Sequence, residues 1–124
     1  MELIRRLDQE AVEATPPDQR HVQALLTRAT GATSCSVSWI RTPPGGGSPE
    51  GLHVHDVDQV FYVLAGTMHV EVGGEVAVIG PGGLVLFPAG RPHRNWNEGS
   101  EPTVHLAINA PAPDPGAPFA RPVG

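Results

Sequence analysis

The chain has 124 residues, a formal net charge of −5 at pH 7 and a pI near 5.6. This length is enough for one domain with a modest core, and the acidic balance argues against nucleic acid or an anionic membrane as a partner. No apolar run approaches the ~18 residues of a membrane span, and the first residues lack the pattern of a signal peptide. Cys35 is the only cysteine, so we expect a soluble cytoplasmic protein with no disulfide within the chain.

Residues 1–29 are expected to form an arm and edge elements before the main domain. Apolar residues in the segment 1–14 have a weak helical spacing, but Leu3 and Ile4 are equally suited to the start of an edge strand. The proline pair that follows ends whichever element forms. Strands are then predicted over residues 22–28 and 32–41.

The main domain is predicted to span residues 30–110 and to be built from short strands. Fifteen glycines and fourteen prolines separate short apolar runs, which is typical of many short elements joined by tight turns. The Gly73-Gly74 pair is typical of a two-residue hairpin turn. We therefore expect an all-β sandwich or barrel, followed by an extended arm or disordered tail over residues 111–124. Further strands are predicted at residues 52–55, 59–64, 68–72, 76–79, 84–87, 93–97 and 104–108.

Two histidines one residue apart form the first candidate site. Side chains alternate between faces in an extended strand, so His53 and His55 point to the same side and can bind one metal ion. Gln59 has the same parity, but an unbroken strand would place it about 20 Å from His53. It can share the ion only if the chain reverses at residues 56–58, so that two neighbouring strands face one point. A further candidate ligand, His93, follows much later in the chain.

These residues resemble the two sequence motifs of the cupin family. The first motif, G-x5-H-x-H-x3,4-E-x6-G, is matched, with glutamine in place of glutamate, by Gly47, His53, His55, Gln59 and Gly66. The second motif, G-x5-P-x-G-x2-H-x3-N, is matched at every spacing by Gly82, Pro88, Gly90, His93 and Asn97. The segment between the motifs has the short length found in many small microbial cupins.

The resemblance implies a fold, a metal and an assembly. The fold is a single cupin β-barrel of the double-sheet jelly-roll type, and the assembly common to single-domain cupins is a homodimer. The resemblance also implies one divalent metal ion at the centre, held by His53, His55, Gln59 and His93. Gln59 can alternatively act as an amide that holds one of the ligand histidines by a hydrogen bond. These ligand types suit zinc, iron, nickel and manganese, so they do not identify the metal.

Glutamine in place of glutamate changes the expected chemistry. Three imidazoles and one amide form a neutral ligand set, which favours a divalent ion over a trivalent one and leaves the ion a stronger Lewis acid. This ligand set resembles that of cupin polyketide cyclases and sugar-acid ring-opening enzymes. We therefore expect a divalent-metal-dependent enzyme that acts on a small oxygenated organic molecule as a cyclase, isomerase or lyase. The alternatives are an Fe(II)-dependent dioxygenase and a non-catalytic metal- or ligand-binding barrel.

Four further side chains are candidates for the wall of a substrate pocket. Phe61 and Val63 share the parity of the motif glutamine in their strand. Asn95 shares the parity of the last ligand histidine. Trp39 belongs either to the pocket wall or to a dimer interface.

Two more histidines are candidates for an acid or base in the pocket, because histidine titrates near neutral pH. His69 lies between Met68 and Val70, so it faces outward if that apolar pair faces the core. His105 has the same ambiguity in the last predicted strand of the barrel.

Overall fold

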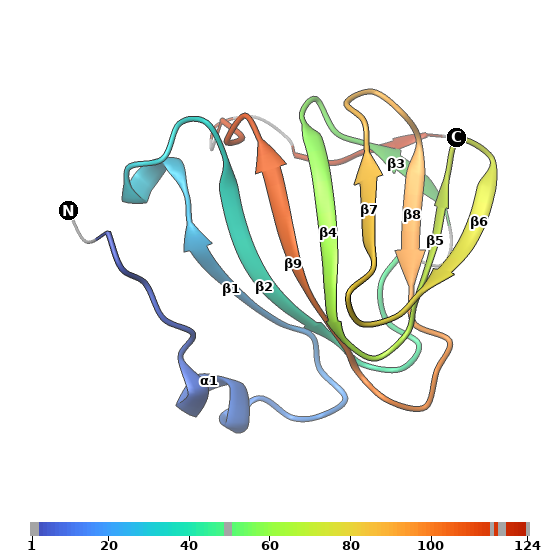
Figure 1. Cartoon of the computed structure of the whole chain (residues 1–124), viewed down its shortest axis with the longest axis horizontal. Helices are drawn as coiled ribbons and strands as arrows, with labels where there is room; N and C mark the ends of the chain where they lie inside the picture. Colours follow the sequence, from blue (N-terminus) through green and yellow to red (C-terminus); the bar gives the residue numbers. More distant parts are fainter. Residues whose placement is uncertain (1–2, 49–50, 115, 117–118, 124) are drawn as a thin grey trace.

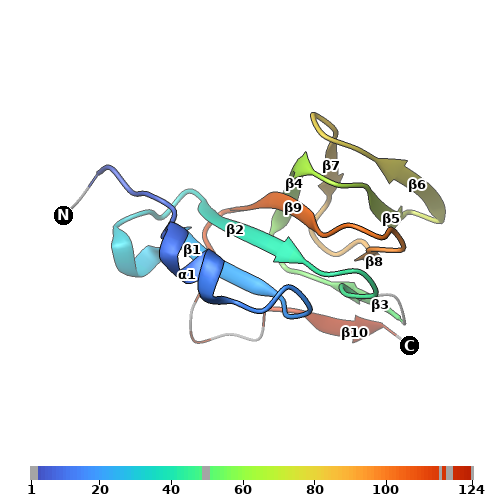
Figure 2. The same ribbon diagram turned by 90° about the horizontal axis from the view of Figure 1, so that it is seen from below.

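The computed structural model describes residues 3–48, 51–114, 116 and 119–123. Two five-stranded antiparallel sheets face each other, and the prediction of an all-β fold is confirmed (Figures 1 and 2). The first sheet has the order β1 (His21–Leu26), β2 (Ser36–Thr42), β9 (Thr103–Ala110), β4 (Asp58–Ala65) and β7 (Leu84–Phe87). The second sheet has the order β10 (Arg121–Val123), β3 (Leu52–Val54), β8 (His93–Trp96), β5 (Met68–Val72) and β6 (Glu75–Ile79). None of the helices in the described residues has the length and apolar character needed to cross a membrane.

The segment before β1 forms a short helix, α1 (Gln9–Ala14), which decides between the two possibilities that the sequence left open. The Asp8 side chain accepts a hydrogen bond from the first turn of α1, as an N-cap residue does. The Arg41 guanidinium donates hydrogen bonds to backbone carbonyls at the end of α1 and so holds the helix beside β2 (Figure 2). Leu3 and Ile4 lie outside any strand and are exposed.

The hydrophobic core lies between the two sheets and follows the strand alternation. In β4, Phe61 and Val63 are buried while Tyr62 and Leu64 are exposed. Buried apolar residues on β2, β5, β7 and β9 join them. The buried core cluster is Ile40, Phe61, Val63, Met68, Val70, Phe87 and Ala107.

The turn after the two motif histidines carries the chain from one sheet to the other. The motif spacing predicts that β3 and β4 are neighbouring strands, but β3 pairs with β8 and β10 in the second sheet, whereas β4 pairs with β7 and β9 in the first. Gln59 therefore faces the histidines across the interior. The Asp58 carboxylate accepts a hydrogen bond from the Ala89 N–H, and the Gly90 N–H donates to the His55 carbonyl. These contacts hold the turns of the two motifs together.

Two predicted glycine features are present, each for a physical reason. Gly73 and Gly74 both have positive φ angles (59° and 81°) and join β5 to β6 as a two-residue hairpin. Gly47 has φ of 99°, and a Cβ there would lie 2.6 Å from the Asn95 carbonyl oxygen. The first motif glycine therefore allows its loop to approach the backbone of β8.

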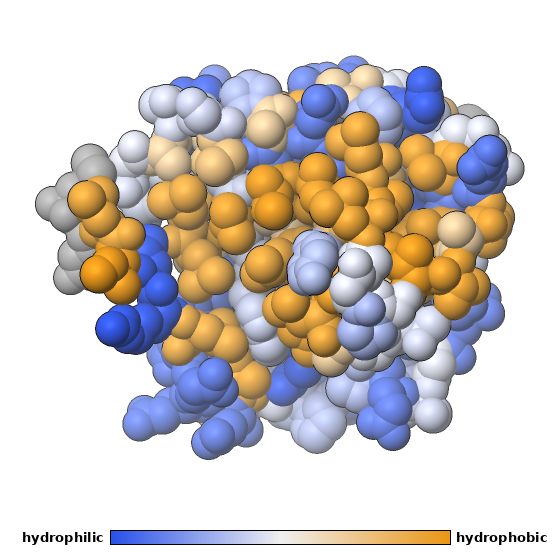
Figure 3. Space-filling view, viewed as in Figure 1, coloured by the Kyte–Doolittle hydropathy of each residue, from blue (hydrophilic) through white to orange (hydrophobic). Residues whose placement is uncertain are grey.

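The outer face of the first sheet is apolar rather than polar. One cross-strand row on this face contains Trp39, Leu106, Tyr62 and Leu84, paired in that order across β2, β9, β4 and β7. Leu84 is 59% exposed, and apolar side chains gather over the middle of this face (Figure 3). The free face of an antiparallel sheet is commonly polar, so this face differs from that of an ordinary solvated sheet.

Candidate metal centre

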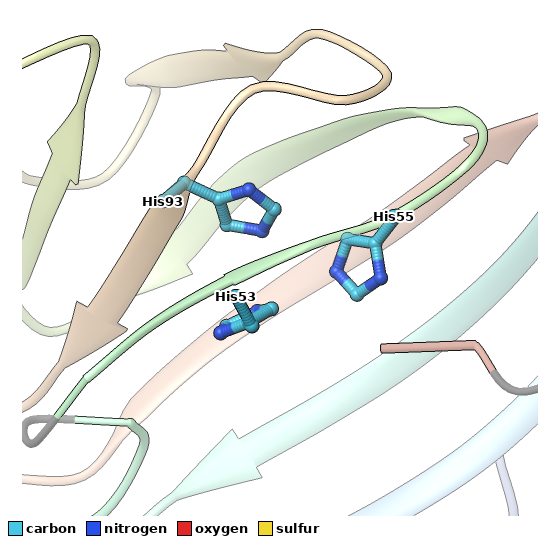
Figure 4. Close-up of side chains that lie close together, drawn as sticks. All are labelled: His53, His55 and His93. Atoms are coloured by element: carbon cyan, nitrogen blue, oxygen red, sulfur yellow. The ribbon is translucent and has the colours of Figure 1, made fainter. Parts of the chain in front are cut away.

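Three histidines converge at the inner surface of the second sheet (Figure 4). His53 lies in β3, His55 follows directly after that strand, and His93 begins β8. His53 and His93 are register partners, so backbone pairing brings the two motifs together. One ring nitrogen from each of the three lies within 4.8 Å of the others, and the ring centroids are 4.4–5.0 Å apart. These three histidines therefore form a cluster of potential metal ligands.

Backbone carbonyls orient two of these rings. The His55 Nδ1–H donates to the Phe119 carbonyl at 2.9 Å, and the His93 Nδ1–H donates to the Arg91 carbonyl at 3.2 Å. Aromatic side chains pack against the same rings: Phe119 stacks on His55 and Phe87 on His93, each with centroids 4.1 Å apart. When Nδ1 carries the proton, the lone pair of the other ring nitrogen, Nε2, is available to a cation.

The electrostatics keep the rings neutral, which is the form that binds metal. Burial lowers the pKa of His53, His55 and His93, and it lowers the pKa of His93 to about 4. His93 is 1% exposed, and its Nε2 has no hydrogen-bond partner. A buried acceptor without a partner is uncommon in native proteins. A divalent cation at the centre of the cluster would satisfy this nitrogen, so the residues present fit a metal ion.

Gln59 reaches the cluster from the opposite sheet and is held by a chain of amide hydrogen bonds. It is buried in β4, and its Nε2 donates to Asn109 Oδ1 at 3.0 Å. The Asn109 Nδ2 in turn donates to Ser36 Oγ at 3.1 Å. Because Nε2 is committed to Asn109, Oε1 is the atom that remains for the histidine side. A hydrogen bond between the Gln59 and His55 side chains acts to raise the pKa of His55, against the larger effect of burial. Direct binding of a metal by Gln59 stays a prediction.

A cavity of about 360 Å³ opens beside the histidine cluster. Of the predicted pocket and acid–base residues, it is lined by Phe61, Asn95 and His105. His105 lies in β9, is 1% exposed, and has its ring centroid 4.2 Å from that of Phe61. Burial, with a smaller contribution from the charge of Arg20, lowers the pKa of His105 to about 4. Neither of its ring nitrogens has a hydrogen-bond partner.

Three other candidate site residues do not line this cavity. For Trp39 and His69 this is the alternative that the sequence left open, and for Val63 it corrects the prediction of a pocket wall. Trp39 lies on the face of β2 opposite to the cavity-lining Ile40, and its ring contacts His21. Val63 has the expected inward direction but is fully buried in the core beyond the cavity. His69 lies on the face of β5 away from the core, near Trp96 and 3.6 Å from the Glu98 carboxylate. Strand alternation decides which side each residue takes, and the single sequence did not reveal which side faced the cavity.

Several cavity residues were missed from the sequence. Asn109 shares the parity of His105 in β9, so alternation from that histidine would have found it. Arg20 stands alone in a proline-rich segment and Phe119 in the expected tail, and neither carries a local pattern. The additional lining side chains are Arg20, Ser38, Ile40, Thr42, Ser48, Ala107, Asn109, Phe119 and Ala120.

Two facing antiparallel sheets with three histidines converging between them define a class of small β-barrels built around one polar centre. A sequence profile of the Cupin domain matches residues 38–109, more than half of the chain. The chain therefore belongs to the cupin family. No curated protein matches it closely enough to add a function.

Solved structures agree with this assignment. TT1209 from Thermus thermophilus is 28% identical, with a TM-score of 0.70 over 89% of this chain and 100% of that one. The polyketide cyclase RemF from Streptomyces resistomycificus is 20% identical, with a TM-score of 0.73 over 98% of this chain and 87% of that one. KdgF from Halomonas sp. is 20% identical, with a TM-score of 0.65 over 80% of this chain and 84% of that one. The likeness to RemF and KdgF shows the shared fold.

Proposed function

We propose that this protein is a divalent-metal-dependent enzyme that acts on a small oxygenated organic molecule as a cyclase, isomerase or lyase. The observation that carries the proposal is the opening of one cavity onto both the histidine cluster and His105, whose ring nitrogens are uncommitted. The structural likeness to a protein described as a polyketide cyclase supports the cyclase type.

The cluster supplies the electrophilic side of the chemistry. A divalent cation held by His53, His55 and His93, with Gln59 as the expected fourth ligand, would polarise a carbonyl or enolate oxygen. The side chains of Ile40, Phe61 and Ala107 give the cavity apolar walls, which exclude water and strengthen electrostatic interactions inside.

His105 supplies the proton-transfer side. Because its lowered pKa keeps the ring neutral at pH 7, His105 can accept a proton from a bound substrate and return it later in the reaction. The contact with Phe61 holds the ring in place at the cavity wall. Asn95, from β8, adds an amide that can orient a polar group of the substrate.

The first test is elemental analysis of untagged protein purified without added metal. We expect about one divalent ion per chain, retained by the parent protein and lost from His93→Ala. Removal of the ion with a chelator should lower the melting temperature, because the metal stabilises only the folded state. If no ion is retained at stoichiometric level and the chelator leaves the melting temperature unchanged, a metal enzyme is excluded.

The second test separates the type of reaction. Enolisable polyketide-like ketones and sugar acids would be incubated anaerobically with zinc-loaded protein, and the products analysed by mass spectrometry. Turnover without oxygen supports the cyclase, isomerase or lyase class, whereas oxygen uptake that requires added Fe(II) would assign a dioxygenase. Binding without turnover across the panel would favour a non-catalytic barrel. The His105→Gln variant should lower kcat by about 10² or more while leaving the metal content unchanged.

A further inference from the structure

The cavity carries positive charge in a protein whose overall charge is negative. Within the described part of the chain, its lining includes the guanidinium of Arg20 and contains no aspartate or glutamate. The whole chain, by contrast, has a formal net charge of −5. A cavity lined by one sign of charge with apolar walls raises the local concentration of ions of the opposite sign.

Arg20 has hydrogen-bonding capacity that the fold does not use. It precedes β1 at the rim of the cavity, exposed on one side and lining the cavity on the other. Among the described residues it forms neither an ion pair nor a hydrogen bond. An arginine stays protonated in proteins and presents five N–H donors in a planar fork.

His105 is a second, independent sign of a missing ligand. Its side chain is almost completely buried, and both Nδ1 and Nε2 lack partners. Leaving a buried polar group unpaired destabilises a folded protein, so such a group usually has a partner in the working state. Arg20 and His105 line the same cavity, and the charge of Arg20 acts to lower the pKa of His105, so a ligand in the cavity can face both side chains.

We propose that the cavity binds an organic carboxylate whose carboxylate group lies between Arg20 and His105. This inference deepens the proposed function, on which it rests, by naming the class of substrate. The planar fork of one arginine matches the two oxygens of a carboxylate, and the neutral imidazole donates one further hydrogen bond. A phosphate group, with its higher charge, would favour a lysine or a second arginine in the site. Neither is among the described lining residues, so the cavity suits a carboxylate better.

The test uses three small aromatic compounds of similar shape: benzoate, benzamide and phenyl phosphate. Affinities are measured by isothermal titration calorimetry on the protein as purified and again after chelator treatment, which removes any contribution of carboxylate binding to a metal. We expect benzoate to bind about tenfold more tightly than benzamide in both forms. The preference should disappear in Arg20→Gln and persist in Arg5→Gln, which removes the same charge at an exposed position outside the cavity.

A His105→Phe variant tests the other half of the site. Phenylalanine keeps the aromatic packing on Phe61 but cannot donate a hydrogen bond, so benzoate affinity should fall about tenfold with the melting temperature preserved. Any of three results would overturn the proposal. They are equal binding of benzoate and benzamide to the parent protein, an unchanged preference for benzoate in Arg20→Gln, and tighter binding of phenyl phosphate than of benzoate.

The result of the carboxylate-binding test can be distinguished from the results of the tests of metal content and turnover. A preference for benzoate in chelator-treated protein that depends on Arg20 supports the carboxylate site even if the protein retains no metal and turns nothing over. Stoichiometric metal with turnover, but without the carboxylate preference, would leave the enzyme proposal standing and remove this one.

Discussion

At the scale of single residues, hydrogen bonds and packing hold the polar side chains of the interior in place, with partners that are local for His93 and distant in the sequence for His55 and Gln59. His55 and His93 are oriented by backbone carbonyls, and Gln59 by Asn109. His105 differs from them because its ring is fixed by packing against Phe61 while its nitrogens are left free. The first three residues are held at fixed positions around the candidate metal site, whereas both ring nitrogens of His105 are available to a ligand in the cavity.

The burial of His105 makes stability depend on pH. In the unfolded chain His105 has its ordinary pKa of 6.5, whereas in the folded protein the pKa is about 4. Between these values the unfolded state binds more protons, so stability is present above pH 6.5 and is lost as the pH falls toward 4. His105→Gln should flatten this dependence, as measured by urea unfolding at several pH values between 4 and 7. A variant as acid-sensitive as the parent would assign the loss to other groups.

The amide chain behind Gln59 should control metal affinity. Asn109→Ala removes the acceptor that orients Gln59, and we expect zinc affinity to fall by about 10- to 100-fold, measured by competition with a chromophoric chelator. Ser36→Ala removes only the outer bond of the chain and should have a smaller effect. If Asn109→Ala binds zinc as tightly as the parent protein, Gln59 either is not a ligand or does not need Asn109 for its position.

At the scale of elements, the last described strand has a role beyond closing the sheet. The sequence predicts an extended arm or a disordered tail for residues 111–124, and within the described residues β10 pairs with β3, the strand that carries His53. Just before β10, Phe119 supplies both the carbonyl and the aromatic ring that fix His55. The arm therefore reaches across the end of the cavity that carries the histidine cluster.

Truncation after residue 114 should weaken the metal centre without destroying the barrel, because the truncated segment adds only one short edge strand. We expect zinc affinity to fall about tenfold, since His55 loses its Nδ1 acceptor. Phe119→Leu keeps the carbonyl and the β10 pairing, so its zinc affinity should fall less than that of the truncated protein. Chelator competition on all three proteins measures the difference, and equal affinities would show that the arm does not support the centre.

At the scale of the whole molecule, the apolar outer face of the first sheet needs an explanation that one chain does not supply. Exposed side chains on this face include Tyr62 (38%), Leu84 (59%) and Leu86 (47%), and they lie in register across β4 and β7. Large exposed apolar patches often mark protein–protein interfaces. The homodimer expected from the cupin resemblance remains a proposal, and this face is where we place its interface (Figure 3).

The proposed dimer can be tested by charge substitution. Leu84→Lys together with Leu86→Lys should convert the dimer to a monomer, as measured by light scattering after size-exclusion chromatography. Val76→Lys, at an equally exposed apolar position on the other sheet, should leave the assembly unchanged. The first sheet would be ruled out as the dimer interface if the parent protein were already monomeric, or if only the Val76 substitution broke the dimer.

Local patterns in the sequence were enough to predict strands at the positions of β1 to β9, the hairpin at Gly73-Gly74 and the histidines that converge at the centre. Alternation, turn residues and motif spacing are properties of a few neighbouring residues, so they can be recognised without a structure. The tertiary structure alone decided that β3 and β4 lie in opposite sheets, that Trp39 and His69 face away from the cavity, and that Arg20, Asn109 and Phe119 all line it. These facts depend on which strand faces cover each other and on contacts between residues far apart in the sequence, such as Ser36 and Asn109 at 73 positions, which no local pattern encodes.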